Sequence, residues 1–176
     1  VCLAALGIWR ERHGAIYLPF RQITPIVSAT EAGEGNVLLV NAWHPLPEDY
    51  QPAALVNLYE QRHSFLLASS EIWLEKTAYE AAEAMFHQAE EDGVNGFIIT
   101  SGYRTRAEQE EIYAQTTDGT AALPGTSEHE TGLAFDVTAQ RDNGGFEETP
   151  QFAWLIENCW DFGFILRYPE EDEEIT

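Results

Sequence analysis

The segment 127–136 places two metal-binding side chains on either side of a glycine. It reads Ser-Glu-His-Glu-Thr-Gly-Leu-Ala-Phe-Asp, so the imidazole of His129 and the carboxylate of Asp136 are seven residues apart, with Gly132 between them. This pattern favours a turn that leads into a strand at Leu133–Thr138. A mononuclear catalytic zinc usually takes three protein ligands and leaves its fourth position to water. The segment therefore predicts half of a zinc site and requires a third ligand elsewhere.

The rest of the chain supplies no obvious third ligand. The other histidines have no motif around them; they are His13, His44, His63 and His87. With only Cys2 and Cys159, neither a cysteine-based metal site nor a disulfide framework can be built. Cys159 lies in an apolar helical stretch, where we expect a buried thiol.

Thirty acidic residues against nine basic ones give the chain a formal net charge of -21. Long-range repulsion at this charge disfavours binding to nucleic acid and to anionic membrane surfaces. The charge is typical of a solvated surface and does not by itself indicate a cationic substrate. With 176 residues, 44% of them hydrophobic, the chain is long enough for one domain with its own core.

We assign residues 1–36 to an N-terminal segment and residues 37–176 to a single folded domain, because no repeat or linker divides the latter. The apolar stretch Val1–Ile8 is too short to span a bilayer and lacks Met. It fits the stub of a removed signal or anchor, and it equally fits an arbitrary boundary. Localisation therefore does not follow from these residues.

Helical and strand-like patterns together predict an α+β fold with a mostly antiparallel sheet packed with helices. The clearest pattern is Glu75–Asp92, where apolar residues recur at helical spacing and Gly93 follows as a stop. Thr105 and Glu108 form a capping box that starts a second helix through Tyr113. The other predicted elements are a buried strand at Val37–Val40, a short helix from Pro52 to about Arg62, strands at Gly96–Thr100, Leu133–Thr138 and Phe164–Tyr168, and a helix that starts at Thr149-Pro150 and ends near Gly163, with Phe152, Leu155, Ile156 and Cys159 on its apolar side.

The pattern Ser127-x-His129-x-x-Gly132-x-Ala134-x-Asp136 resembles the zinc motif of the D-alanyl-D-alanine carboxypeptidases of the VanY type, within the wider LAS peptidase group. Further segments resemble the same family in the same order: Leu39–Asn41 with His44–Pro47, Ser101–Thr105 with Gln109 and Tyr113, and Trp154-Leu155 with Gly163–Pro169. The resemblance runs from about residue 37 to the end of the sequence. It implies the LAS fold, which is similar to that of hedgehog domains and D,D-peptidases.

The resemblance also implies a role for each matching side chain. It makes His129 and Asp136 zinc ligands and makes Ser127 a contact for the terminal carboxylate of the substrate. Arg104 becomes the cation that binds the substrate and stabilises the oxyanion, which suits a rigid, permanently charged guanidinium at the end of a strand. The remaining two residues, Tyr103 and Gln109, are expected to shape the substrate pocket.

In the family, a Glu-x-x-His stretch follows the closing segment and supplies the general base and the third zinc ligand. The present sequence stops at Glu171–Thr176, where Glu174 and Ile175 resemble the family residues just before that stretch, so we expect the natural chain to continue. We expect Glu128 and Glu130 to be solvated surface residues rather than the base. Without a general base the rate should fall roughly a hundred- to ten-thousand-fold.

The leading hypothesis is a zinc-dependent carboxypeptidase that removes the terminal D-alanine from peptidoglycan stem peptides, in cell-wall remodelling or in antibiotic resistance. The alternatives are a non-catalytic module that recognises a peptide terminus through Arg104 and Ser127, and a related cell-wall endopeptidase. The residues do not distinguish a D,D bond from an L,D bond, or a carboxypeptidase from a dipeptidase. The resemblance implies an extracytoplasmic location, at the cell surface or secreted. We expect a monomer that binds a peptide substrate and has no stable protein partner.

Overall fold

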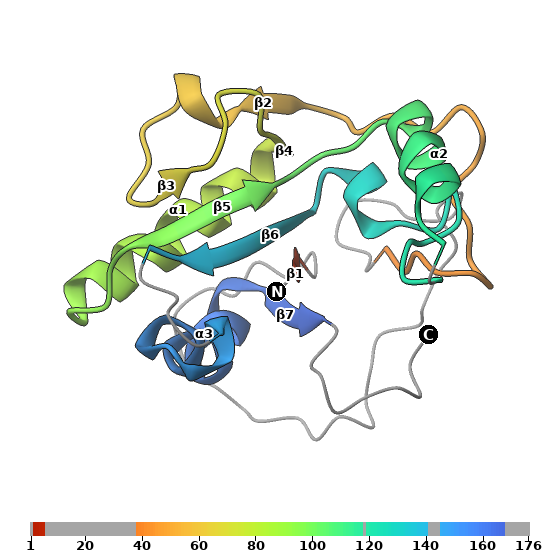
Figure 1. The fold of residues 1–176 in the computed structure, drawn as a ribbon. Coiled ribbons are helices and arrows are strands. Elements are labelled where there is room, and N and C mark those ends of the chain that lie inside the picture. Colours follow the sequence, from red (N-terminus) through yellow and green to blue (C-terminus); the bar gives the residue numbers. More distant parts are fainter. Residues whose placement is uncertain (1, 6–37, 118, 141–144, 168–176) are drawn as a thin grey trace, which may run out of the picture.

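Two antiparallel strands, β5 (Phe97–Ser101) and β6 (Ala134–Ala139), form the centre of the fold (Figure 1). The computed structural model describes residues 2–5, 38–117, 119–140 and 145–167. The strand order of the main sheet is β3-β5-β6-β1-β7, and β3 pairs with β5 in parallel. Its edge strands are β3 (Leu66–Leu67) and β7 (Phe164–Arg167), and β1 (Cys2–Ala5) lies between β6 and β7. A separate antiparallel pair is formed by β2 (Leu55–Asn57) and β4 (Trp73–Glu75).

The two faces of β6 have different environments. Phe135 and Val137 are buried in the core, whereas Asp136 lies on the opposite face because side chains alternate along a strand. The register between β5 and β6 shifts between Ile99 and Ser101, so Ser101 lies opposite Asp136. Such irregularities often redirect side chains next to functional sites. The shift brings the end of β5 next to the carboxylate of β6.

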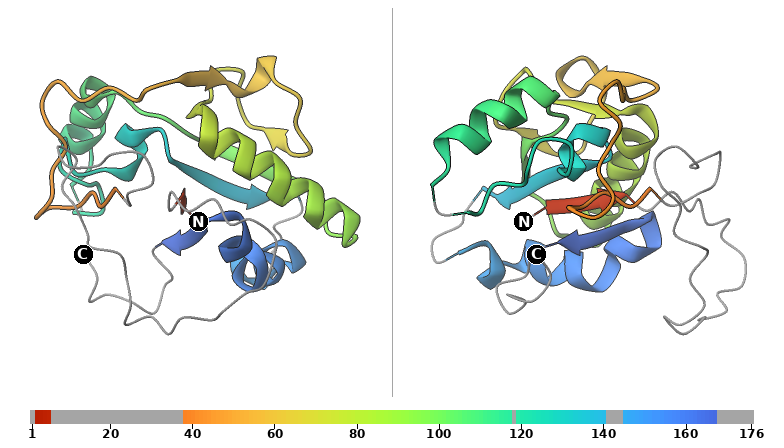
Figure 2. Two further views of the ribbon diagram at one scale, coloured as in Figure 1. Left: turned by 180° about the vertical axis from the view of Figure 1, so that it is seen from behind. Right: turned by 90° about the vertical axis from the view of Figure 1, so that its right-hand side faces the viewer.

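Helices α1 (Lys76–Glu91) and α3 (Pro150–Asn158) contribute to the core on the other face of the sheet (Figures 1 and 2). The ring of Phe86 in α1 lies 4.8 Å from that of Phe97 and 6.0 Å from that of Phe135, measured between centroids. Burying one such side chain contributes about 1.5–3 kcal/mol. Helix α2 (Arg106–Gln115) lies apart from this core, beyond the end of β5 (Figure 1).

Local signals account for the ends of the helices. The side chain of Glu75 accepts a hydrogen bond from the Thr77 amide at the start of α1. Thr105 and Glu108 form the predicted capping box of α2, and the backbone and side-chain hydrogen bonds from Thr105 lower the pKa of Glu108. Thr149 caps α3. Short 3-10 turns are η1 (Leu58–Glu60), η2 (Glu128–Thr131), η3 (Phe146–Glu148) and η4 (Cys159–Phe162).

The predicted α+β fold with a mostly antiparallel sheet is confirmed. The three long helical patterns correspond to α1, α2 and the combination of α3 with η4, and three of the predicted strands correspond to β5, β6 and β7. The burial of Cys159 is also confirmed. However, Ile156 is 47% exposed, so its assignment to the apolar side of α3 was wrong, and Trp154 lies in the core instead.

The predicted helix from Pro52 to Arg62 is wrong. This stretch contains β2, which pairs with β4, and then the single turn η1, where the Asn57 side chain accepts a hydrogen bond from the Tyr59 amide. Pairing with a strand distant in sequence therefore outweighs the helix-start signal of Pro52. The predicted strand at Val37–Val40 is also wrong for residues 38–40, which form no strand, although Val40 is buried.

Several predictions concern residues outside the described ranges and stay predictions. They include the assignment of residues 1–36, the candidate ligand His13, and the account of the acidic stretch after Pro169. Within the described ranges, no helix combines the length and the apolar character needed to cross a membrane.

The thiol of Cys159 should be unreactive in the folded protein. Burial raises its pKa to about 11, so at pH 8 only about one thiol in a thousand is the nucleophilic thiolate. We expect iodoacetamide to leave Cys159 unmodified under native conditions and to label it fully in guanidinium chloride, as measured by peptide mass mapping. Rapid native labelling would contradict the buried position.

Candidate metal and substrate site

The turn η2 presents His129 to the end of the main sheet. Gly132 closes the turn in the left-handed conformation with φ of 72°, and its amide donates to the carbonyl of His129. The Gly132 carbonyl in turn accepts a hydrogen bond from the Glu75 amide at 2.8 Å. A side chain at position 132 would press on the Glu75 backbone and on Leu55. This glycine is therefore required by both its backbone conformation and its close packing.

The ring of His129 is held by the segment that follows β5. Its Nδ1 lies 2.8 Å from the carbonyl oxygen of Gly102, and its own carbonyl accepts a hydrogen bond from the Arg104 amide at 3.1 Å. A hydrogen bond to a carbonyl places the proton on Nδ1 and directs Nε2 away from it, as second-shell partners of metal-binding histidines do. Gly102 can lie against the backbone of Trp73 because it has no side chain. A Cβ atom at this position would overlap the carbonyl oxygen of Trp73.

Asp136 lies next to this ring. Its Oδ1 is 3.6 Å from Nε2 of His129. Burial raises the pKa of Asp136, but the hydrogen bond and charge of His129, together with a hydrogen bond from Ser101, outweigh burial and hold the pKa below its usual value. The side chain is therefore a carboxylate at neutral pH.

The spacing of these two side chains fits zinc. Two ligands that each lie about 2.0–2.1 Å from a tetrahedral ion are roughly 3.3 Å apart. The observed 3.6 Å between Nε2 of His129 and Oδ1 of Asp136 is close to that value without any change in the fold. The residues therefore fit two positions of a zinc site.

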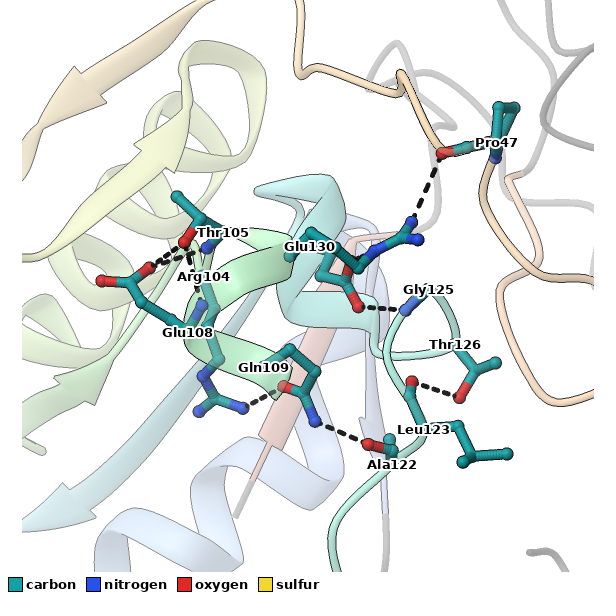
Figure 3. A network of polar contacts seen from close by, with 11 residues as sticks. Pro47, Arg104, Thr105, Glu108, Gln109, Ala122, Leu123, Gly125, Thr126 and Glu130 are labelled. Carbon is teal, nitrogen blue, oxygen red and sulfur yellow. Dashed lines mark hydrogen bonds and ion pairs between the residues drawn. The ribbon is translucent and has the colours of Figure 1, made fainter. Parts of the chain in front are cut away.

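Arg104 is oriented by a buried glutamine (Figure 3). Its Nη1 donates to Oε1 of Gln109 at 2.8 Å, and Nε2 of Gln109 donates to the carbonyl of Ala122 at 2.7 Å. Gln109 is 1% exposed, so this chain of hydrogen bonds fixes the guanidinium rather than leaving it in solvent.

Arg104 also lines a hollow of about 200 Å³ together with Tyr50 and Tyr103. Burial, followed by nearby carboxylates, raises the pKa of both tyrosines, so their hydroxyl groups are neutral donors. Ser127 is buried at the start of η2, one residue before Glu128. The structure thus gathers the six predicted site residues around η2 and the segment after β5, although it does not test their roles.

Comparison with known proteins identifies the family of this chain. The sequence profile of the VanY family, described as D-alanyl-D-alanine carboxypeptidase, matches residues 71–176. The chain belongs to the VanY family. A D-alanyl-D-alanine carboxypeptidase of Enterococcus faecium is 35% identical to it over 153 residues, which cover 85% of this chain and 50% of that protein. The chain spans about half the length of the curated relatives it matches, from 50% to 59% for three of them.

Solved structures show the same fold. The LD-carboxypeptidase LdcB superposes with a TM-score of 0.67 at 32% identity, over 79% of this chain and 70% of that one. VanYB in complex with D-alanine-D-alanine gives 0.59 at 33% identity, over 79% and 78%. A variant of the vancomycin resistance D,D-pentapeptidase VanY in complex with Zn(II) gives 0.59 at 32% identity, over 79% and 80%. These neighbours confirm the predicted LAS-type fold of the VanY family.

The expectation that Glu128 and Glu130 are solvated is wrong. Glu130 is 4% exposed and its Oε2 lies 2.5 Å from Nε of Arg106. Glu128 is largely buried and its Oε1 lies 2.9 Å from Nη2 of Arg167 at the end of β7. Both arginines were missed because their partners lie 24 and 39 residues away in the sequence. No local sequence pattern indicates either pair.

The described part of this VanY-family chain does not supply a third metal ligand. No group of three or more histidine, cysteine or acidic side chains suited to one ion occurs in the described ranges. The other described histidines are engaged or distant: His44 contacts Asn41, His63 contacts the Phe65 carbonyl, and His87 is exposed on α1. The described half-site therefore consists of His129 and Asp136.

Gly102 should be intolerant of any side chain. Replacing it with alanine forces the new methyl group into the Trp73 carbonyl, and we expect a loss of about 2–4 kcal/mol in the free energy of unfolding, measured with urea. Gly93→Ala is the matched control, because φ is positive there but nothing lies within 4 Å; we expect it to cost about 1 kcal/mol. Equal losses in the two variants would refute the close approach.

Proposed function

We propose that this chain carries the peptidase domain of a zinc-dependent D-alanyl-D-alanine carboxypeptidase that removes the terminal D-alanine from peptidoglycan stem peptides. The observation that carries the proposal is the pairing of His129 Nε2 with Asp136 Oδ1 at 3.6 Å, with Nδ1 of the same ring directed to the Gly102 carbonyl. Membership of the VanY family, whose relatives are named for this activity, supports it.

A zinc ion held by His129 and Asp136 would polarise the scissile carbonyl and activate a water molecule. The Gly102 carbonyl keeps the histidine in the tautomer that leaves Nε2 as the ligand atom. Asp136 lies 3.6 Å from that nitrogen and would supply a carboxylate oxygen to the same ion. We assign the third ligand and the general base to residues outside the described ranges.

Arg104 supplies positive charge for the substrate and for the developing oxyanion. Gln109 fixes its guanidinium through one donor, and the remaining donors can meet an oxyanion or a carboxylate. Ser127, buried at the start of η2, offers a hydroxyl for the terminal carboxylate of the peptide. Tyr103 and its hollow would then shape the neighbouring part of the substrate pocket.

The proposed substrate implies where in the cell the enzyme acts. Peptidoglycan stem peptides lie outside the cytoplasmic membrane, so we propose an extracytoplasmic site of action, in cell-wall remodelling or in resistance to antibiotics that bind D-Ala-D-Ala. The solved neighbours include an LD-carboxypeptidase as well as a complex with D-alanine-D-alanine. A product assay should therefore compare a pentapeptide ending in D-Ala-D-Ala with a tetrapeptide ending in an L,D bond. Release of free D-alanine from the pentapeptide supports the proposal, and release from the tetrapeptide alone would contradict the D,D specificity.

The zinc assignment is tested by His129→Ala in the full-length protein. We expect this variant to lose bound zinc and D-alanine release, because the remaining ligands hold the ion much more weakly. His87→Ala is the control, since that histidine is exposed on α1. Metal content is measured by mass spectrometry after dialysis, together with the intact mass of the chain. Equal zinc in the wild type and in His129→Ala would exclude the assignment.

The role of Arg104 is tested by Arg104→Lys. Lysine keeps the charge but lacks the planar fork that reaches Gln109 and the substrate together. We expect kcat to fall about 100- to 1000-fold, with zinc content and thermal stability close to the wild type. Arg62→Lys, at an exposed position, should leave kcat unchanged. An unchanged kcat in Arg104→Lys would remove Arg104 from the catalytic machinery.

A further inference from the structure

Glu130, the residue after the metal-binding histidine, uses both carboxylate oxygens inside the protein. Oε2 lies 2.5 Å from Nε of Arg106, and Oε1 accepts a hydrogen bond from the Gly125 amide at 2.7 Å. The side chain is 4% exposed. Figure 3 shows it directed toward Gly125, away from the hydrogen bonds around Arg104.

Arg106 extends the contact to a third segment. Its Nη2 donates to the carbonyl of Pro47 at 3.3 Å, and the Gly125 carbonyl accepts from the Leu46 amide at 2.7 Å. Gly125 also packs directly on the guanidinium: a methyl group built there would lie 3.0–3.1 Å from Cζ, Nη1 and Nη2 of Arg106. The first turn of α2, the loop at 123–126 and the segment 46–50 therefore meet on η2.

These segments border the hollow beside Arg104. Glu130 and Arg106 line it on one side, and Glu48 and Tyr50 line it from the segment that Arg106 holds. The amide of Tyr50 donates to the same Pro47 carbonyl that accepts from Arg106. A shift of that carbonyl would therefore move Tyr50, which is part of the wall of the hollow.

A purely stabilising role explains this pair poorly. Removing two charges from water costs about as much free energy as their mutual attraction contributes. Replacing a buried ion pair with apolar side chains is therefore often neutral or stabilising for the folded state. What the pair provides is a fixed geometry, since Glu130 is rigidly attached to η2 and Arg106 to α2.

We propose that Arg106 and Glu130 are positioning residues that couple η2 to the segment 46–50 and thereby fix the substrate-binding hollow beside Arg104. The inference rests on the proposed function in that the hollow receives the part of the peptide next to the scissile bond. Neither residue touches the reacting atoms. Their loss should change how the substrate is held more than how fast it is hydrolysed.

The test uses Glu130→Gln in the full-length enzyme. Glutamine can still accept from Gly125 but turns an amide donor toward Arg106, so the ion pair is lost with little change in shape. We expect KM for the pentapeptide to rise about 3- to 10-fold with kcat within about 2-fold, and zinc content unchanged. Arg106→Lys keeps the charge with fewer donors and should show the same change in KM, to a smaller extent.

Two further variants separate positioning from stability. In Glu130→Gln combined with Arg106→Met no charge is left unpaired, so the melting temperature should recover while KM stays raised. Trp154→Phe is the control, because it removes a hydrogen bond to Asp92 at 2.9 Å far from the site; it should lower the melting temperature without changing KM. A KM that simply follows the melting temperature across all four variants would overturn the proposal.

Hydrogen exchange provides a readout that does not depend on activity. Amide exchange in Glu130→Gln should become faster at 46–50 and 123–126 and stay unchanged in β5. Unchanged exchange in both segments, or a loss of zinc with an unchanged KM, would overturn the coupling. If the wild-type enzyme releases no D-alanine from any peptide, the proposed function fails, while the exchange data still decide whether the pair couples the two segments.

Discussion

The contact between the His129 ring and the Gly102 carbonyl determines the rest of the site. It joins a turn late in the chain to the end of β5, and it exists because Gly102 can press against the backbone of Trp73 in β4. In the same segment the Arg104 amide donates a hydrogen bond to the His129 carbonyl, so the backbones of these two residues are joined directly. A register shift in β5 then sets Ser101 against Asp136, which completes the half-site. One close approach of two backbones thus brings the His129 ring, the Asp136 carboxylate and the Arg104 guanidinium together.

The arginine side chains around this contact differ in their partners. The chain has nine basic residues, and Arg104, Arg106 and Arg167 all lie at or beside η2. Two of them pair with the carboxylates that flank His129. Arg104 is instead held by the neutral amide of Gln109. A neutral partner fixes the guanidinium without cancelling its charge, and that charge is what an anionic peptide terminus and an oxyanion require.

The sequence predicted the parts of the fold that depend on neighbouring residues. The capping box of α2, the periodicity of α1 and the alternation in β6 are local, and all three were confirmed. The helix predicted from Pro52 to Arg62 was wrong because the conformation of this stretch follows from pairing with β4. The burial of Glu128 and Glu130 was missed for the same reason, since each partner lies far away in the sequence. Family resemblance could name His129, Asp136 and Arg104, but it carried no information about the variable positions of the motif, where Glu128 and Glu130 lie.

The shortness of η2 explains why such distant partners are needed. A 3-10 turn of four residues makes few internal hydrogen bonds, so its own backbone does little to fix the position of His129. Arg167 holds Glu128 from β7, and Arg106 holds Glu130 from α2, with His129 between them. The position of the turn that carries His129 therefore depends on the elements on both sides of it. A change in either pair would be expected to alter the site through the position of the turn, even though neither pair contains a ligand.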